Sequence, residues 1–239
     1  MSKYYYNEDY FKKIDTSEKA YWLGFLYADG CITRFYRNEK LKSMSLELTL
    51  QDVDCEHLVK FKNALESNVP IQHKIIKNKY KSDRIVINCT NMCRDLIKLG
   101  CTPVKSLTLE FPNNDVLPDK YIRDFIRGYF DGDGGVSYTE GVYYNKNRNK
   151  EYKQHSYVCY FCGNEQFILK LKNILECNNI KVSDLKKDKR SNAVNIYLYG
   201  NENIETFKNF IYTNNCVNLS RKYDKFFFIS NNKDLHINR

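Results

Sequence analysis

The segment WLGFLYADG, residues 22–30, recurs later in the chain as IRGYFDGDG, residues 126–134. The copies align at an offset of 104, from position 22 to position 126. Further along, LVKFKNAL at residues 58–65 parallels ILKLKNIL at residues 168–175, where the offset has grown to 110. A long internal repeat predicts two similar structural units stacked against each other. The growth of the offset predicts an insertion in the second unit, and we place it in the polar run at residues 143–154.

The repeat divides the chain into an N-terminal unit, residues 1–113, and a C-terminal unit, residues 114–239. The polar, turn-prone segment EFPNNDVL at residues 110–117 links them. Each unit is expected to run helix, two strands, helix, two strands, helix. Strands are expected at residues 31–36, 44–50, 73–80, 84–89, 136–144, 157–161, 180–185 and 193–199. Intervening helices are expected at residues 54–66, 91–99, 165–177 and 201–212, with Asp54, Asn91, Asn164 and Asn201 as candidate caps.

Composition indicates a protein that binds a polyanion. The chain of 239 residues has a net charge of +9 and a pI of about 8.9, which favours DNA or RNA as a partner. No stretch has the length of a membrane span and the N-terminus lacks a secretory core, so we expect a cytoplasmic or organellar protein that is not secreted. The nine cysteines are expected to be reduced, and Cys159 and Cys162, although spaced CxxC, are interpreted as strand residues and not as a zinc or redox pair.

The repeated helix ends in a pattern that carries chemistry. Small residues stand four apart in each copy, Gly24 with Ala28 and Gly128 with Gly132, which lets two helix backbones approach closely. Each copy then ends in an Asp-Gly pair, with Asp29 and Asp133 as the acids; the glycines are expected to form left-handed caps.

Two carboxylates at the negative ends of touching helices repel each other and both helix dipoles, so the arrangement calls for a cation. Oxygen ligands suit Mg²⁺ foremost. Two alternatives fit less well. A plain polar stop at each Asp-Gly pair is disfavoured by the duplication in register. A calcium loop at FDGDGG fails because positions six and twelve, counted from Asp131, are Val136 and Val142, where glycine and glutamate are needed.

These motifs resemble those of the LAGLIDADG homing endonucleases. The resemblance extends to CTPVKS at residues 101–106 and SRKYDKF at residues 220–226, so it covers nearly the whole chain. It implies an α+β fold of two pseudo-symmetric αββαββα repeats, with a two-helix central interface and a saddle of two antiparallel four-stranded sheets over DNA. It also implies a monomer that uses Mg²⁺, with Mn²⁺ or Ca²⁺ as substitutes, to break both strands of a long DNA target and leave short 3′ overhangs.

The resemblance assigns candidate roles residue by residue. Asp29 and Asp133 take the positions of the metal-binding acids, and the preceding residues Ala28 and Gly132 are included in the candidate metal site. Lys105 and Lys222 match the family's basic residues near the active site, although Arg221 competes with Lys222, and a solvated surface charge is the plain alternative for either lysine. Gln51 stands where similar proteins often have a polar, water-organising residue, but its counterpart falls among Phe161, Cys162 and Gly163 and pairs poorly. At the motif position where the family name LAGLIDADG has its first Asp, the first copy has Tyr27 and the second copy has Asp131.

Basic residues collect at four corresponding places on expected strands and hairpins, which predicts an extended phosphate-contacting surface. The candidate DNA-binding residues are Arg34, Arg37, Lys40, Lys42, Lys74, Lys77, Lys79, Lys81, Arg84, Lys146, Arg148, Lys150, Lys153, Lys186, Lys187, Lys189 and Arg190.

Three rival functions remain in view. An RNA maturase that assists splicing of a group I intron could share this fold, with intron RNA as its partner. A non-catalytic DNA-binding protein would be expected to lack the acids that are present here. An enzyme carried by a self-splicing protein insertion is disfavoured by the first and last residues of the sequence.

Overall fold

The computed structural model describes residues 4–76, 80–105, 108–188 and 192–231. The first repeat consists of α1 (Ser17–Asp29), β1 (Gly30–Arg37), β2 (Lys40–Gln51), the short 3₁₀ helix η1 (Asp52–Asp54), α2 (Cys55–Ala64), β3 (Gln72–Ile76), β4 (Tyr80–Ile87) and α3 (Thr90–Lys98). The second consists of η3 (Asp119–Tyr121), α4 (Ile122–Asp133), β5 (Gly134–Asn145), β6 (Lys150–Gly163), α5 (Glu165–Cys177), β7 (Lys186–Lys187), β8 (Val194–Tyr199) and α6 (Asn201–Ile211). A further helix, α7 (Ser220–Asn231), follows it.

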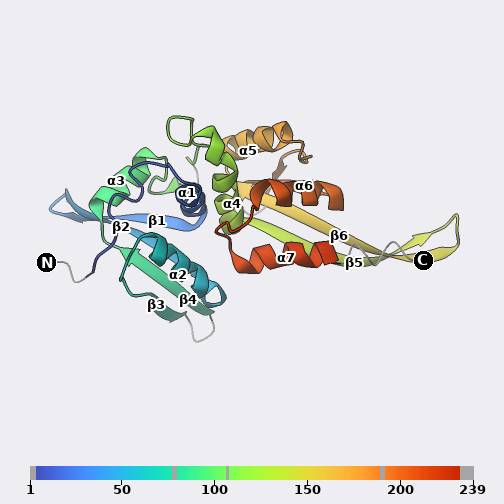
Figure 1. Ribbon diagram of the computed structural model, residues 1–239, viewed down its shortest axis with the longest axis horizontal. Helices are drawn as coiled ribbons and strands as arrows, with labels where there is room; N and C mark the ends of the chain where they lie inside the picture. The colour runs from blue at the N-terminus through green and yellow to red at the C-terminus, as the bar shows by residue number, and fades with distance from the viewer. Residues whose placement is uncertain (1–3, 77–79, 106–107, 189–191, 232–239) are drawn as a thin grey trace.

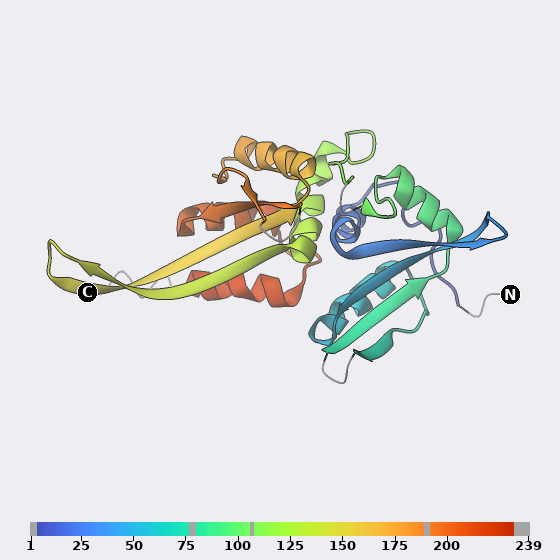
Figure 2. The ribbon, with the colours of Figure 1, turned by 180° about the vertical axis from the view of Figure 1, so that it is seen from behind.

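Two four-stranded antiparallel sheets have the same topology, β1-β2-β4-β3 and β5-β6-β8-β7. Helices α2 and α3 pack on one face of the first sheet, and α5 and α6 on one face of the second. Helices α1 and α4 lie side by side at the centre, and the sheets extend from them in opposite directions (Figures 1 and 2). The predicted α+β architecture of two αββαββα repeats is confirmed.

The hydrophobic pattern positions each sheet by strand alternation. In β2 the buried residues are Met44, Leu46 and Leu48, and the residues between them are more exposed. In β8 the same pattern buries Val194, Ile196 and Leu198. Because a strand directs alternate side chains to opposite faces, each sheet has one face under helices and one open face.

The insertion predicted at residues 143–154 is the end of a long hairpin. Strands β5 and β6 pair continuously from Gly134 with Phe161 to Asn145 with Lys150. Their 12 and 14 residues exceed the 8 and 12 of β1 and β2, and the hairpin projects from the second sheet (Figure 1).

Several local predictions were wrong. Residues 180–185 contain no strand, and β7 is only Lys186–Lys187. Thr16 caps α1, accepting a hydrogen bond from the amide of Lys19. Of the predicted caps, Asn164 does accept such a bond, from the amide of Phe167 at 2.9 Å. Gly30 and Gly134 have φ of −69° and −89°, so both are extended and start a strand directly, with no left-handed cap.

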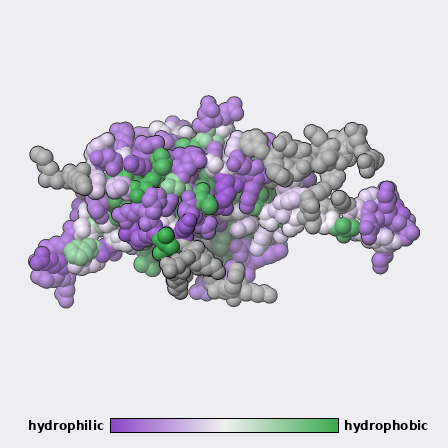
Figure 3. All heavy atoms as spheres, turned by 90° about the horizontal axis from the view of Figure 1, so that it is seen from below, coloured by the Kyte–Doolittle hydropathy of each residue, from purple (hydrophilic) through white to green (hydrophobic). Residues whose placement is uncertain are grey.

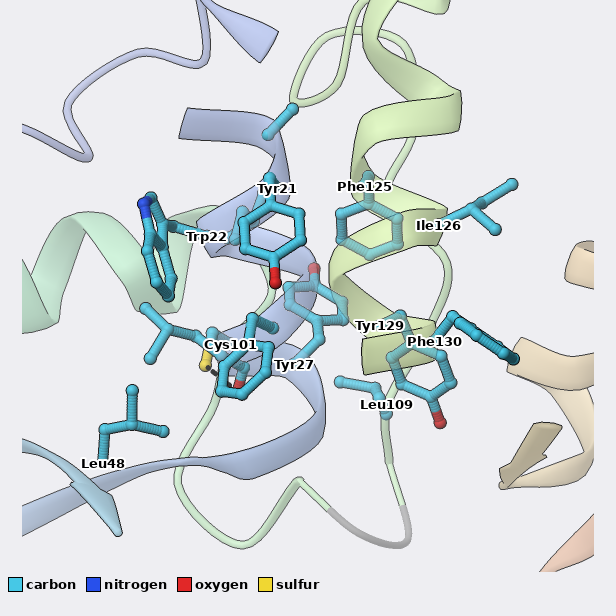
Figure 4. Close-up of a cluster of buried hydrophobic side chains, with 14 of the residues drawn as sticks. Tyr21, Trp22, Tyr27, Leu48, Cys101, Leu109, Phe125, Ile126, Tyr129 and Phe130 are labelled. Atoms are coloured by element: carbon cyan, nitrogen blue, oxygen red, sulfur yellow. Dashed lines mark hydrogen bonds between the residues drawn. The ribbon is translucent and has the colours of Figure 1, made fainter. Parts of the chain in front are cut away.

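Aromatic side chains fill the core around the central helices. Tyr27 from α1 meets Phe125 from α4 edge to face, with ring centroids 5.0 Å apart (Figure 4), and such pairs add stability beyond their burial. Trp22 points the other way, onto Phe61 of α2. Among the described residues, no helix has both the length and the apolar character needed to cross a bilayer.

Candidate active site at the ends of the paired helices

Helices α1 and α4 touch along their glycines. A Cβ atom built on Gly24 would overlap the carbonyl oxygen of Phe125, and one on Gly128 would overlap the carbonyl oxygen of Tyr21. A Cβ on Gly132 would overlap that of Ala28. The predicted small-residue contact therefore forms, and it brings the two helix ends together.

Asp29 and Asp133 are the last residues of these helices. Both keep an exposed edge, yet protein surrounds them on the other sides. The pKa of Asp29 is raised to about 6, first because burial removes water and then because Asp133 carries the same charge, while Lys222 and Lys105 oppose the rise. Burial also raises the pKa of Asp133, against the same two lysines.

Lys105 binds the end of α1 through three backbone carbonyls. Its Nζ donates hydrogen bonds to the oxygens of Leu26 at 2.7 Å, Ala28 at 2.8 Å and Gly30 at 2.6 Å. The last four carbonyls of a helix have no partner within it and carry partial negative charge, so a cation there stabilises the end. Lys105 thus holds the turn that presents Asp29.

Lys222 makes the same three contacts at the end of α4. Its Nζ donates to the oxygens of Phe130 at 2.9 Å, Gly132 at 2.9 Å and Gly134 at 2.5 Å. These acceptors stand 104 positions after those of Lys105, the offset of the repeated motif. Burial lowers the pKa of Lys222 to about 8, with Asp131 and Asp29 opposing the fall.

The reading of these lysines as solvated surface charges is wrong. Lys222 is only 6% exposed, and Lys105 is half-buried. Arg221, the alternative candidate to Lys222, instead forms a bidentate salt bridge with Asp54, with hydrogen bonds from Nε at 3.0 Å and from Nη2 at 2.9 Å. The register of α7 therefore assigns Lys222 to the helix end.

Gln51 is exposed at the end of β2. Gly30 faces Leu48 and Gly134 faces Phe161, so Gln51, three residues beyond Leu48, corresponds to Asn164. The expected counterpart among residues 161–163 was wrong, because counting from the motif alone misses the register of the inserted hairpin.

Asn164 lines a pocket of about 170 Å³ together with Asp133, Lys105 and Ala28. Its side chain also caps α5 and donates to the carbonyl of Leu109 at 2.5 Å. The sequence pattern predicts only the capping role for Asn164. The strand register could have identified its place beside Asp133.

Asp131 is the centre of a buried network that sequence reasoning missed. It is 1% exposed and accepts hydrogen bonds from Tyr21 Oη at 2.8 Å, Tyr212 Oη at 2.9 Å and the amide of Leu219 at 2.7 Å. The corresponding Tyr27 donates outward, to the carbonyl of Leu99. The first acid of the second motif thus joins α1, α4 and the segment before α7.

The predicted DNA contacts divide between the two faces of the sheets. Lys74, Arg84 and Lys186 lie on open faces, since Lys74 pairs with Ser82, Arg84 with Thr49 and Lys186 with Asn195. Arg34 and Lys81 have the opposite parity, because Arg34 pairs with the buried Met44 and Lys81 stands two residues before the buried Asp83. Strand alternation therefore places Arg34 and Lys81 on the helix-covered face of the sheet and not on the open one, although both side chains are exposed.

The remaining predicted contacts lie mostly at the hairpins. Arg37, Lys40, Lys42, Lys146, Arg148, Lys150 and Lys187 are all exposed. Hydrophilic residues dominate the two extended ends of the molecule (Figure 3). Lys77, Lys79, Lys189 and Arg190 lie outside the described residues, and for Lys153 only the backbone of β6 is described.

Comparison with known proteins adds independent findings. Residues 120–212 match the family model described as the LAGLIDADG-like domain. A mutant of I-SmaMI has a TM-score of 0.62 at 11% identity, over 91% of this chain and 92% of that one. The I-LtrWI LAGLIDADG homing endonuclease bound to target DNA has a TM-score of 0.61 at 12% identity, over 96% and 92%.

Two further matches extend these comparisons. I-SmaMI bound to an uncleaved DNA target in the presence of calcium ions has a TM-score of 0.56 at 12% identity, over 90% of this chain and 92% of that one. A protein of Methanocaldococcus jannaschii described as a probable translation initiation factor IF-2 is 24% identical over 223 residues, which are 86% of this chain. The match spans 16% of that protein's length.

Proposed function

We propose that this chain, whose residues 120–212 match the LAGLIDADG-like domain and whose fold is that of I-SmaMI and I-LtrWI, is a LAGLIDADG homing endonuclease, a site-specific enzyme that breaks both strands of a long DNA target and leaves short 3′ overhangs. The observation that carries the proposal is the pair Asp29 and Asp133 at the ends of touching helices, each end held by a lysine through three carbonyls. Both acids belong to one chain, so a monomer contains the whole site.

The donor set at the helix ends fits Mg²⁺. Asp29 lies against the partner helix, since its Oδ2 is 3.3 Å from the position that a Cβ on Gly132 would take, and its charge is repelled by that of Asp133. This repulsion falls when a divalent cation binds. The carbonyl oxygens of Ala28 and Gly132 accept from the lysines and each keeps a second lone pair, so they remain candidate ligands. The ion would supply Lewis-acid activation of water and phosphate, with Mn²⁺ or Ca²⁺ as substitutes.

The chain's own residues position this site. Lys105 and Lys222 fix the last turn of each helix and offset the negative charge that the two dipoles and two carboxylates concentrate there. Each Nζ is engaged by three carbonyls, so the lysines act by holding the carboxylates and by making the local potential less negative for an approaching phosphate. Asn164, in the pocket beside Asp133, is a candidate for orienting water, and Gln51 is its counterpart in the first repeat.

Double-stranded DNA is the proposed partner, bound across the open faces of the two sheets. Lys74, Arg84 and Lys186 are candidates for phosphate contacts on these faces, and the exposed basic residues of the hairpins for contacts farther out. Arg84 is braced by Gln72 and Glu47, so it is held in place on the sheet.

The proposal is tested with Asp29→Asn and Asp133→Asn, alone and together, on a duplex selected from a random library by binding. Cleavage should fall by about 10³-fold or more, because metal stabilisation of the transition state supplies several kcal/mol. Binding of the duplex without added Mg²⁺ should be retained. Asp115→Asn, an exposed acid of the linker, is the matched control and should cleave normally.

A double variant that still cuts the duplex would overturn the assignment of the acids. Tighter binding of intron RNA than of any selected duplex, with stimulation of splicing, would replace the endonuclease proposal with the maturase.

A further inference from the structure

Three metal-binding side chains converge in the first repeat, away from the helix ends. Cys55 is the first residue of α2, and His73 of β3 stands directly opposite Asp83 of β4. One ligand atom from each lies within 4.8 Å of the other two. His73 Nδ1 and Asp83 Oδ1 are 2.7 Å apart.

The carboxylate in this cluster is buried. Asp83 is 3% exposed and has the strand parity of Ile85 and Ile87, on the helix-covered face. Burying a carboxylate is costly unless a cation or hydrogen bonds compensate. In the part of the chain that the structure describes, its ionic partner is His73 and the thiol of Cys55 lies nearby, with no lysine or arginine in salt-bridge range.

We propose that Cys55, His73 and Asp83 form a transition-metal site, with Zn²⁺ as its preferred ion. Thiolate sulfur, imidazole nitrogen and carboxylate oxygen are the three ligand types that Zn²⁺ takes, and water completes a tetrahedron. This donor set differs from the all-oxygen site at the helix ends, so the two sites would select different ions. On binding, the thiol proton of Cys55 passes to solvent and the thiolate ligates the metal.

The geometry permits this with small movements. Ligand atoms about 2.0–2.3 Å from Zn²⁺ in a tetrahedron are roughly 3.3–3.8 Å apart, so the 2.7 Å hydrogen bond must open by less than about 1 Å. The side chain of His73 is 73% exposed and can turn, whereas the buried Asp83 fixes the position of the ion.

Occupancy would tie the β3–β4 hairpin to α2. Lys74 and Arg84 follow His73 and Asp83 in sequence and lie on the opposite, open face. The metal would therefore stiffen a hairpin that presents two of the proposed phosphate contacts. The corresponding cross-strand pair in the second sheet, Lys187 and Val194, offers no metal ligand, so among the described residues this donor set has no counterpart in the second repeat.

The site is tested by titrating Co²⁺ into metal-free full-length protein that carries Asp29→Asn and Asp133→Asn, which removes the helix-end acids. We expect one equivalent to produce thiolate-to-cobalt charge-transfer absorption, reversed by Zn²⁺ and unchanged by excess Mg²⁺. Cys55→Ser should abolish the band and His73→Ala should weaken binding at least about 10-fold. Cys177→Ser, at an exposed free cysteine on another helix, should change neither.

A second measurement does not depend on the folding of any variant. Zn²⁺ should slow alkylation of Cys55 by iodoacetamide at least about 10-fold in wild-type protein, located by peptide mass, and leave the rate at Cys177 unchanged. A cobalt band that survives Cys55→Ser, or alkylation of Cys55 that is indifferent to Zn²⁺, would overturn the proposal. Neither result bears on DNA cleavage, so the metal-site proposal can fail without affecting the endonuclease proposal.

Discussion

The two repeats are alike where they meet and different where they diverge from the centre. At the helix ends, Lys105 and Lys222 make matching sets of three hydrogen bonds, and Asp29 and Asp133 occupy matching positions. Two residues earlier the match breaks, because Tyr27 donates to a carbonyl while Asp131 accepts from three donors. Symmetry is thus kept in the groups that the proposed reaction uses twice, and lost in the groups that only support them.

The open faces of the sheets differ further. In the first, Arg84 bridges Glu47 and Gln72. In the second, Tyr160, Tyr197 and Tyr199 cluster, and Lys186 lies 5.2 Å from the ring centroid of Tyr197. A DNA target bound across both would meet a charged, hydrogen-bonding surface on one side and an aromatic one on the other, which favours a target with two dissimilar halves.

The helix contact should give the largest effect and the most symmetric one. Gly24→Ala and Gly128→Ala each drive a Cβ into a backbone carbonyl of the partner helix, and backbone cannot repack as a side chain does. Each should lower the free energy of unfolding by about 3 kcal/mol or more, measured by urea denaturation.

Gly141→Ala is the control for this pair, because a Cβ there meets nothing within 4 Å. If Gly24→Ala and Gly128→Ala lower the free energy of unfolding by amounts that differ by more than about 1 kcal/mol, the two sides of the interface do not contribute equally to stability.

Much of the symmetric part was predictable from the sequence. The repeat of WLGFLYADG in IRGYFDGDG fixes two equivalent helices, and small residues four apart predict their contact, because both are local patterns with a helical period. The two acids follow from the same alignment. Strand alternation likewise predicts one buried and one open face for each sheet.

The remainder depends on register and on tertiary contacts. The contacts of Lys105 come from a loop whose path no local periodicity sets, and Lys222 could be separated from Arg221 only by the rotation of α7. Asn164 was hidden because the hairpin insertion shifts the numbering. Asp131 looked like an ordinary motif residue, since its three donors come from segments far apart in the chain.

The lysines give the next largest effect and test how equal the two helix ends are. Lys222→Met leaves three carbonyls without their donor at a site that is 6% exposed, and should cost about 3 kcal/mol of stability. Lys105→Met should cost less, about 2 kcal/mol, because water reaches the half-buried loop and replaces part of the loss.

Lys225→Met on the same helix is the control, because Lys225 is exposed and makes one long hydrogen bond, 3.4 Å to the carbonyl of Val136. Its unfolding midpoint in urea should move little. A cost for Lys105→Met equal to that for Lys222→Met would mean that solvent access does not distinguish the two ends.

The position where the motifs differ gives a smaller effect. Asp131→Asn replaces one accepting oxygen with a donor that faces Tyr212, or else Tyr21 and Leu219, and should cost about 2 kcal/mol. Tyr27→Phe removes a single hydrogen bond and should cost about 1 kcal/mol. Thermal denaturation of both variants provides the comparison, and a larger loss for Tyr27→Phe would contradict the central role given to the Asp131 network.

The smallest effect concerns an ion pair between the repeats, between Arg221 and Asp54, whose matching position in the first repeat has no charged residue. Arg221 reaches from α7 to Asp54 of the first repeat, whereas its counterpart beside Lys105 is Val104, which is 86% exposed. The side chain of Arg221 is 45% exposed, so water screens the pair, and Arg221→Met should cost about 1 kcal/mol. A double-mutant cycle with Asp54→Asn should give a coupling of similar size that shrinks at high salt. If the coupling is absent, this ion pair does not help to hold the repeats together, and the difference between Arg221 and Val104 does not affect stability.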